Sequence, residues 1–327
     1  MARIAVIGAG LAGLVVARAL GERHDVTVVE KGRGVGGRMA TRYAGSFEFD
    51  HGAQFFTARS EAFRDFLRPL AERSVIARWD ARFAELRRNE IGEIRRWNAE
   101  YPHYVGVPRM SAVCKWLALG LDVRLETAVT SLLAENGGWR LATESVKLPE
   151  IFDWIVITAP AAQAAALVPA DSRLHETASA YRMQPCFALM LGFARAQAVP
   201  WQATRVRDAD ISWISVNQSK PGRPIGSSLL VHSTNAWADA HVNDDPAGIR
   251  AHLMREFSDV TGVPADAAQY VELHRWRYAN IERQRGQLYA IDRGYRLAAA
   301  GDWFVRGRVE GAFLSASALS AELASLL

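Results

Sequence analysis

A glycine-rich turn near the amino terminus carries the most specific chemistry in this sequence. A G-x-G-x-x-G motif follows the apolar run Arg3–Ile7 and precedes a segment with helical character. Gly8 permits a tight turn, Gly10 lets a pyrophosphate approach the backbone, and Gly13 allows a helix to pack closely on a strand. The N–H groups and dipole of that helix favour phosphate. We therefore expect a bound dinucleotide here, and neither a signal peptide nor a turn of small residues.

An acidic residue and a second glycine-rich segment follow this turn. Val26–Val29 reads as a strand that ends in Glu30, whose carboxylate can accept hydrogen bonds from an adenosine ribose and would repel a 2′-phosphate. Four of the six residues 32–37 are glycine, which excludes helix and regular strand. This segment is either a flexible loop or a second phosphate cradle, in which Arg38 supplies a fork of donors.

Composition limits the class of protein and its surroundings. The chain has 327 residues, which suggests about two domains, and half of its residues are apolar. Its formal charge is only +4 although 39 residues are basic, and basic segments alternate with acids, so we expect no nucleic-acid binding. Cys114 and Cys186 form no motif, the eight histidines are scattered, and no apolar run is long enough to span a membrane. We expect a cytoplasmic protein without a metal site or a membrane partner.

Several later segments resemble one family of flavoproteins. The R-G-x-G-G-R-M spacing of Arg33–Met39, after a dinucleotide motif and an acid, is similar to FAD-binding oxidoreductases of the amine oxidase superfamily. The chain most resembles the bacterial renalase-like branch of that superfamily. The segments that carry this closer resemblance are Asp50–Phe56, Tyr104–Ala112, Thr158–Pro160 and His274–Ala279. Gly301–Trp303 and Gly307–Ser315 resemble the closing flavin segments and indicate FAD in general. The resemblance therefore covers nearly the whole chain.

The expected fold class is α/β, with a discontinuous, glutathione reductase-like Rossmann-type FAD-binding domain. Into it is inserted an α+β substrate domain built on a mostly antiparallel sheet. The FAD-binding domain is expected to comprise residues 1–58, 104–165 and 285–327, and the substrate-binding domain residues 59–103 and 166–284. In the part of the insert that begins near Ala161 we expect strands and one clear helix, which opens at Asp245-Pro246.

The resemblance and the glycine motif together name the residues expected to contact FAD. They are Gly8, Ala9, Gly10, Leu11, Ala12, Gly13, Glu30, Lys31, Gly37, Arg38, Ala53, Gln54, Val129, Thr158, Pro160, Gly301, Asp302, Val309, Glu310, Gly311 and Ala312. Asp302 is suited to ribityl or ribose hydroxyls. The helix from Val309 would direct its positive end at the pyrimidine edge of the flavin, although it can also be an ordinary docking helix. Val129 can equally be a valine of a strand core. FAD is expected to be held non-covalently.

The sequence also limits the reaction. There is one dinucleotide motif and no redox-active cysteine pair, so a substrate must reach the flavin directly, with dioxygen as the expected electron acceptor. The resemblance implies that the substrates are isomeric dihydronicotinamide dinucleotides, which carry the hydride at ring position 2 or 6. Transfer to flavin N5 would give NAD(P)+ and hydrogen peroxide. Because no proton leaves with the hydride, this reaction needs flat apolar walls and orienting polar groups but no general base.

Five residues are candidates for this substrate site: Gln54, Asn217, His232, Trp276 and Tyr278. Each can instead be a packed aromatic or a satisfied polar residue of the core. Two other functions remain open. A flavin amine oxidase often uses a lysine near the flavin, but none of the four lysines lies in such a motif. A flavin-binding protein without turnover is the third hypothesis. The preferred isomer and the oligomeric state are not predicted.

Three local expectations concern the chain between these motifs. Val123–Leu133 reads as one strand, and a glycine turn then leads into the second arm of a hairpin. Pro69 is expected to kink or shorten a helix that the apolar spacing predicts between Arg59 and Arg73. Ser219–Pro224, rich in proline and glycine, reads as a surface loop.

Overall fold

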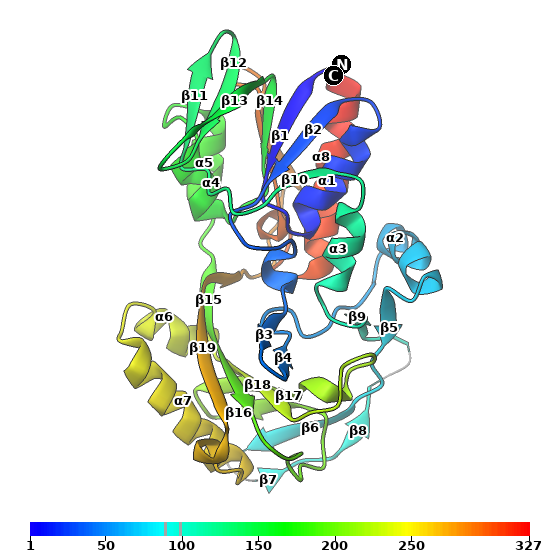
Figure 1. Ribbon diagram of the computed structural model, residues 1–327, viewed down its shortest axis with the longest axis vertical. Coiled ribbons are helices and arrows are strands. Elements are labelled where there is room, and N and C mark those ends of the chain that lie inside the picture. Colours follow the sequence, from blue (N-terminus) through cyan, green and yellow to red (C-terminus); the bar gives the residue numbers. More distant parts are fainter. Residues whose placement is uncertain (88–89, 98–99) are drawn as a thin grey trace. The chain divides into compact units, whose positions relative to one another are not determined.

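The structure, a computed structural model, describes residues 1–87, 90–97 and 100–327 (Figure 1). It divides the chain into two compact units, each assembled from separate segments. Unit 1 comprises Met1–Gly37, Cys114–Met183 and Asn280–Leu327, and unit 2 comprises Arg38–Val113 and Gln184–Ala279. These bounds depart from the predicted domain bounds at residues 38–58, 104–113, 166–183 and 280–284. The predicted division into an FAD-binding and a substrate-binding domain remains a prediction.

Unit 1 is built on a six-stranded sheet. Its strands, in spatial order, are β10 (Asp122–Arg124), β2 (Asp25–Val29), β1 (Arg3–Ile7), β14 (Trp154–Ile157), β21 (Leu297–Ala300) and β20 (Tyr289–Asp292). The first five are parallel and β20 is antiparallel to β21. The valine- and isoleucine-rich strands β1 and β14 are almost entirely buried, as expected for parallel strands covered on both faces. The order β10-β2-β1-β14 is that of a Rossmann-type fold, which confirms the predicted α/β class.

Helices and a small antiparallel sheet complete unit 1. The helices are α1 (Leu11–Gly21), α3 (Ala112–Ala118, whose first two residues belong to unit 2), α4 (Ala161–Leu167), α5 (Arg173–Ser179) and α8 (Val309–Leu326). α1 and α8 pack side by side (Figure 1), and α4 packs on α5. The small sheet contains β11 (Ser131–Glu135), β12 (Gly138–Ala142) and β13 (Lys147–Phe152). None of the helices in the described part of the chain combines the length and apolar character that crossing a bilayer requires.

Unit 2 is built on a second, larger sheet. Its path is β19 (Tyr270–Asn280), β15 (Gln184–Gly192), β18 (Ser228–Ser233), β17 (Ile211–Val216), β16 (Ala203–Arg207), β6 (Arg82–Arg87) and β7 (Glu90–Ile91), and β8 (Arg95–Arg96) also pairs with β6. Pairing from β15 to β16 is antiparallel, while β16 and β6 are parallel. Smaller elements are β3 (Arg42–Ala44), β4 (Phe47–Phe49), α2 (Glu61–Glu72), β5 (Ile76–Arg78) and β9 (Tyr104–Gly106).

The two faces of the unit 2 sheet differ in character. One face packs on helices α6 (Asn235–His241) and α7 (Pro246–Thr261) around an apolar core. The other face, which we call the aromatic face, carries Phe83, Trp213, Ser215, Leu230 and His232, as the strand registers show. Side chains alternate along each strand, so one strand supplies both faces. The aromatic face contains the polar and aromatic side chains from which a site can be built.

Helix α7 forms where the sequence predicts it, for identifiable local reasons. The side chain of Asp245 accepts a hydrogen bond from the Gly248 N–H, and Pro246 occupies the first turn. Gly262 ends the helix with a φ of 70°, a left-handed conformation that suits glycine. The expectation of a single clear helix in the insert is wrong, because the structure also forms α6, whose first turn is capped by the Thr234 side chain.

Two further expectations are corrected. The single strand predicted over Val123–Leu133 is in fact β10 and β11 with a loop between them. Glu126 in this loop has a φ of 52° and donates its N–H to the Gly32 carbonyl, so the backbone turns away from the sheet. Pro69 does not shorten its helix, since α2 continues through it to Glu72.

The turn between β1 and α1 has the close approach that the glycine motif predicts. A Cβ atom added at Gly13 would lie 1.9 Å from the Gly8 carbonyl oxygen, while Gly8 itself has a φ of 110°. A Cβ at Gly10 would meet nothing within 4 Å. Gly8 and Gly13 are therefore required by the protein's own backbone. Gly10 is not required in this way. We therefore attribute the absence of a side chain at Gly10 to the space that a ligand needs.

We predict that Gly10→Ala and Gly13→Ala have different effects. Gly13→Ala should lower the thermal stability of the FAD-free protein, because the new methyl group collides with backbone. Gly10→Ala should leave that stability unchanged and weaken FAD binding by about tenfold or more, since the methyl group would obstruct a pyrophosphate. Thermal unfolding of apoprotein and FAD titration by fluorescence measure both quantities. Gly248→Ala, also in open space, is the control. An unchanged FAD dissociation constant in Gly10→Ala would refute this assignment.

Candidate cofactor and substrate sites

In unit 1, the predicted cofactor residues of the first segment lie where parallel strands end. Glu30 follows β2, and its two carboxylate oxygens accept hydrogen bonds from the N–H groups of Ala9 (2.8 Å) and Gly32 (2.7 Å). Glu30 therefore fixes both glycine-rich loops, a role that the sequence did not predict. Each carboxylate oxygen can accept a further hydrogen bond, so contact with a ribose hydroxyl remains compatible with this geometry. Lys31 donates to the Gln163 side chain at 3.3 Å.

Other predicted cofactor residues of unit 1 lie around the same strand ends or on the last helix. Thr158, directly after β14, lies with its hydroxyl 3.0 Å from the Ile7 carbonyl oxygen and 3.1 Å from that of Gly8. Pro160 is the N-cap residue of α4. Val129 lies half-buried in the loop between β10 and β11, so the alternative of a strand-core valine is wrong. Gly37 ends the first segment of unit 1.

The carboxy-terminal segment places an acid and a helix start in sequence. Asp302 is buried and begins a short 3-10 helix, Asp302–Phe304. α8 then begins at Val309 without a side-chain cap at its N-terminus, so its first turn provides backbone donors. Glu310 and Ala312 are half-buried there. A Cβ on Gly311 would lie 2.5 Å from the Arg306 carbonyl oxygen, so that glycine is required by the backbone itself.

Three residues predicted to contact FAD belong to unit 2. The Arg38 carbonyl accepts the Ala53 N–H at 2.8 Å, and a Cβ on Gly52 would lie 2.0 Å from the same oxygen. The Gln54 amide donates to the carbonyl of Asp50 and, at 2.9 Å, to that of Gly52. These contacts fold residues 50–54 into a tight turn, which we call the Asp50–Gln54 segment.

A buried ion cluster anchors this segment to the unit 2 sheet. It consists of Asp50, Lys220 and Arg223, whose side chains are all 0% exposed. The Asp50 carboxylate accepts hydrogen bonds from Lys220 Nζ at 3.2 Å and from the Arg223 guanidinium at 2.5 Å. Lys220 Nζ also donates, at 3.2 Å each, to the side-chain oxygens of Gln54 and Asn217. The expectation that Ser219–Pro224 forms only a surface loop is wrong, because two of its cations turn inward.

The charge of this cluster is not balanced within it. Burial lowers the pKa of Lys220 to about 8, against the opposing attraction of Asp50. Burial raises the pKa of Asp50, but the charges of Lys220 and Arg223 outweigh that effect and hold it below its usual range. At neutral pH the cluster thus holds two cations and one carboxylate. Its surplus positive charge lies in a low-dielectric interior, where it acts strongly on nearby groups.

The predicted polar candidates Gln54 and Asn217 are both tied to this cluster. The Asn217 amide donates to the Glu48 carbonyl at 3.0 Å, and its oxygen accepts from the Asp50 N–H at 3.3 Å. The Gln54 oxygen accepts from the Ser215 hydroxyl at 2.8 Å. Both amides are buried and their hydrogen-bonding groups are occupied. They position the Asp50–Gln54 segment on the aromatic face.

Aromatic and imidazole rings gather around His51 at the aromatic face. The His51 ring stacks on Trp276 with a centroid distance of 5.1 Å and meets His274 edge-on at 4.9 Å. The His51 carbonyl lies 3.0 Å from Trp276 Nε1 and 3.2 Å from His232 Nε2. The structure thus brings His232 and Trp276 together, as predicted. Tyr278 lies two residues beyond Trp276 on β19, where it is half-buried.

These imidazoles are neutral at physiological pH. Burial lowers the pKa of His51 to about 3 and that of His232 to about 4, and burial also lowers the pKa of His274. The rings therefore present flat, uncharged surfaces. Sequence reasoning named the segment that contains His51 but not His51 itself. The H-x-W spacing of His274 and Trp276 on a strand was the available signal that both rings share one face.

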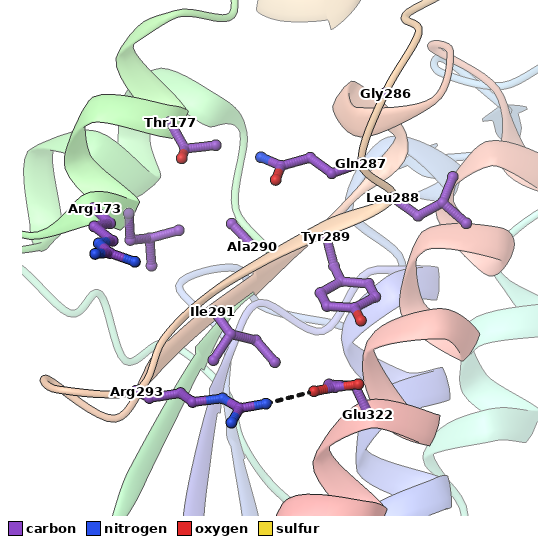
Figure 2. A pocket seen from close by; sticks show the side chains of 11 residues that line it. Arg173, Thr177, Gly286, Gln287, Leu288, Tyr289, Ala290, Ile291, Arg293 and Glu322 are labelled. Carbon is purple, nitrogen blue, oxygen red and sulfur yellow. Dashed lines mark hydrogen bonds and ion pairs between the residues drawn. The ribbon is translucent and has the colours of Figure 1, made fainter.

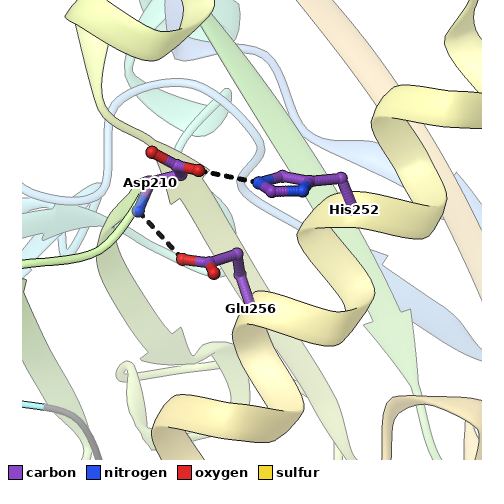
Figure 3. Close-up of side chains that lie close together, drawn as sticks. All are labelled: Asp210, His252 and Glu256. Atoms are coloured by element: carbon purple, nitrogen blue, oxygen red, sulfur yellow. Dashed lines mark hydrogen bonds and ion pairs between the residues drawn. The ribbon is translucent and has the colours of Figure 1, made fainter.

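Two other features of the described chain lie away from the predicted residues. A cavity of about 640 Å³ in unit 1 is lined by residues of α5, by the chain around β20, and by Glu322 (Figure 2). In unit 2, Asp210, His252 and Glu256 lie together (Figure 3). Their groups already bond to one another: His252 Nε2 is 2.8 Å from the Asp210 carboxylate, and Glu256 accepts the Asp210 N–H at 2.9 Å. No residue predicted to bind FAD or substrate lines the cavity or belongs to this trio.

Comparison with known families identifies two matching regions. Residues 6–70 match the NAD(P)-binding Rossmann-like domain, and residues 100–323 match the flavin containing amine oxidoreductase family. The second match covers more than half of the chain. It includes β14, β21 and α8 of unit 1 and most of the unit 2 sheet.

Solved structures share the fold at low sequence identity. A protein described as a protoporphyrinogen oxidase from Exiguobacterium sp. 255-15 is 14% identical, with a TM-score of 0.77 and 98% of each chain covered. A variant of putrescine oxidase is 12% identical, with a TM-score of 0.73, and covers 100% of this chain and 99% of its own. Cyclohexylamine oxidase from Brevibacterium oxydans IH-35A is 12% identical, with a TM-score of 0.68, and covers 98% and 99%.

The surplus charge of the buried ion cluster leads to a stability prediction. Asp50→Asn should lower the free energy of unfolding by about 3–5 kcal/mol, because two buried cations lose their carboxylate. Lys220→Met should cost less, since Asp50 keeps Arg223. The double variant should be more stable than Asp50→Asn alone, because only one cation then lacks a partner. Urea unfolding measures all three, with the exposed Asp65→Asn as control. Strictly additive effects would contradict this description of the cluster.

The geometry of unit 1 fits the cofactor of the matching family. The open space at Gly10, the uncapped first turn of α1, and Glu30 beside both glycine loops suit the phosphates and ribose of FAD. FAD is accordingly the cofactor, and the chain is an FAD-dependent oxidoreductase. It belongs to the flavin containing amine oxidoreductase family.

Proposed function

We propose that this protein is a renalase-like FAD oxidase of isomeric dihydronicotinamide dinucleotides. In this proposal the glutathione reductase-like, discontinuous cofactor domain holds FAD non-covalently. The substrate carries its hydride at ring position 2 or 6, and the products are NAD(P)+ and hydrogen peroxide. FAD supplies the hydride acceptor and the path of electrons to dioxygen. The residues of this chain bind and orient the substrate.

The observation that carries this proposal is the neutral ring cluster around His51. Oxidation of a dihydropyridine gives an aromatic cation without loss of a proton, so the site needs flat walls and no general base. His51, His232 and Trp276 provide such walls, and burial keeps both imidazoles uncharged. The polar side chains of Gln54 and Asn217 support these walls by fixing the Asp50–Gln54 segment. Tyr278, on the same strand as Trp276, is a further candidate wall.

The buried ion cluster favours this substrate over an amine. An alkylamine is a cation in water and must lose its proton before oxidation. Surplus positive charge in the interior of unit 2 opposes the entry of such a cation. A dinucleotide carries negative phosphates, which the same charge attracts. Lys220, the one lysine in the described part of unit 2, is moreover bound to Asp50, Gln54 and Asn217.

Two other functions compete with this proposal. A flavin amine oxidase is consistent with the family and with neighbours named putrescine oxidase and cyclohexylamine oxidase. A flavin-binding protein without turnover is the third hypothesis, and no observation in the structure favours it. The two enzymatic hypotheses differ in which reductant bleaches the flavin.

The deciding experiment is anaerobic reduction of the purified holoenzyme. Borohydride-treated NAD+, which contains the 2- and 6-dihydro isomers, should bleach the flavin within seconds, whereas the ordinary 4-dihydro form is the matched control and should not. Putrescine and cyclohexylamine form the second arm. Bleaching by amines but not by the isomers would replace the proposal with amine oxidation. A flavin that none of these reductants bleaches would support the non-catalytic hypothesis.

We predict that Trp276 acts in substrate positioning and not in FAD retention. Trp276→Ala removes the ring that stacks on His51 and should slow flavin reduction by the isomers by about tenfold or more, a cost typical of lost aromatic contacts. Trp276→Phe keeps a ring but loses the donor to the His51 carbonyl, and should be slowed less. Stopped-flow absorbance measures the reduction rate, and the flavin-to-protein ratio measures retention. An unchanged reduction rate in Trp276→Ala would mean that this residue contributes only to packing.

A further inference from the structure

A second group of rings lies on the aromatic face beside His232. Phe83, Trp97, His103 and Trp213 form what we call the Trp97 ring cluster. Phe55 packs against it, with ring centroid distances of 5.0 Å to Trp97, 4.6 Å to His103 and 5.5 Å to Trp213. Trp97 and His103 stack at 3.8 Å with an interplanar angle of 16°. Trp213 is nearly parallel to Trp97, with 17° between the planes, and stacks on Phe83 at 6.1 Å. All four rings are only partly buried.

The strand register connects the Trp97 ring cluster to the proposed nicotinamide site. Trp213 on β17 is directly opposite His232 on β18. Residues that face each other across two strands have Cβ atoms about 5 Å apart and lie on the same face of the sheet. The two groups of rings are thus neighbours within unit 2. A ligand with two flat bases can occupy both.

Two arginines flank the Trp97 ring cluster. Neither forms an ion pair with a described residue, although Arg205 lies directly opposite Glu85 on β6, whose carboxylate pairs with Arg207. Arg95 is directly opposite Phe83, and Arg205 is directly opposite Trp213. Both are exposed, and among the described residues no ion pair or ring contact engages either guanidinium. Other arginines of the same sheet are paired: Arg207 contacts Glu85 at 3.1 Å, and Arg87 contacts Asp208 at 3.2 Å. Arg82 and Arg96 of this sheet also form no ion pair with a described residue, but they alternate with Phe83 and Arg95 and therefore lie on the opposite face.

From this arrangement we infer that the Trp97 ring cluster, with Arg95 and Arg205, binds the ADP half of the dinucleotide substrate. The inference rests on the proposed function and identifies the site for the part of the substrate that does not react. Adenine stacks on aromatic rings, and the planar guanidinium group matches phosphate oxygens. The negative charge of two phosphates complements two exposed arginines that form no ion pair with a described residue. Binding of this remote half contributes affinity for the dinucleotide without taking part in hydride transfer.

The first test is binding of ADP to the FAD-loaded holoenzyme, measured by titration calorimetry. The bound FAD already fills the dinucleotide site of unit 1, so ADP reports on another site. Wild type should bind ADP, and Arg95→Ala should weaken that binding by at least about tenfold. Arg96→Ala is the matched control, because Arg96 is equally exposed but projects to the opposite face of β8. Absence of ADP binding, or equal loss in both variants, would overturn the inference.

The second test separates the two halves of the substrate. Flavin reduction is compared for the 2- and 6-dihydro isomers of the dinucleotide and of the corresponding mononucleotide, which lacks the adenylate. Arg95→Ala should raise KM for the dinucleotide by about tenfold, leave kcat nearly unchanged, and leave the mononucleotide unaffected. ADP should compete with the dinucleotide only. Equal effects on both substrates would overturn the inference. If neither substrate reduces the flavin, the proposed function fails, and the ADP titration still decides whether this site exists.

Discussion

Ionisation of Asp50 in the interior is the constraint on which the substrate side of this molecule depends. A lone buried carboxylate would take up a proton, but two cations and the Thr41 hydroxyl keep this one charged. The cations come from residues 220 and 223, far from Asp50 in the chain. Their ion pairs thus close a long loop and fix residues 50–54 against β17. The His51 carbonyl of that segment in turn contacts the side chains of Trp276 and His232.

Unit 1 depends on a different kind of constraint, which is steric. At Gly8 and Gly13 the backbone of the turn packs on itself so closely that no side chain fits, and Glu30 joins this turn to the next glycine loop. A rigid turn leaves its helix N–H groups in place before any ligand arrives. The cofactor therefore meets donors that are already ordered, and it need not bear the entropic cost of ordering them.

Interactions between residues that are close together in the sequence could be predicted, whereas interactions between distant residues could not. The glycine motif, the cap of α7 and the strand ends are local, so residue types and spacing were sufficient to predict them. The ion cluster is not local, because nothing near Lys220 indicates that Asp50 is its partner. The proline and glycine residues around Lys220 suggested a surface loop, yet the side chains of Lys220 and Arg223 both turn inward. Gln54 and Asn217 were predicted as candidates for the substrate site, and the structure shows their side chains bonded to backbone and to Lys220.

The same reasoning explains why family membership does not fix the substrate. A dinucleotide turn and a flavin segment are shared by enzymes that oxidise very different compounds, and they account for the fold that this chain shares with structures only 11–14% identical to it. The discriminating features lie in unit 2: rings kept neutral by burial, and a surplus cation that the protein itself leaves unbalanced. A protonated amine is repelled by that charge, while an anionic dinucleotide is attracted to it. In the proposed function, the substrate class is selected by the sign of one buried charge and by the protonation of the rings beside it.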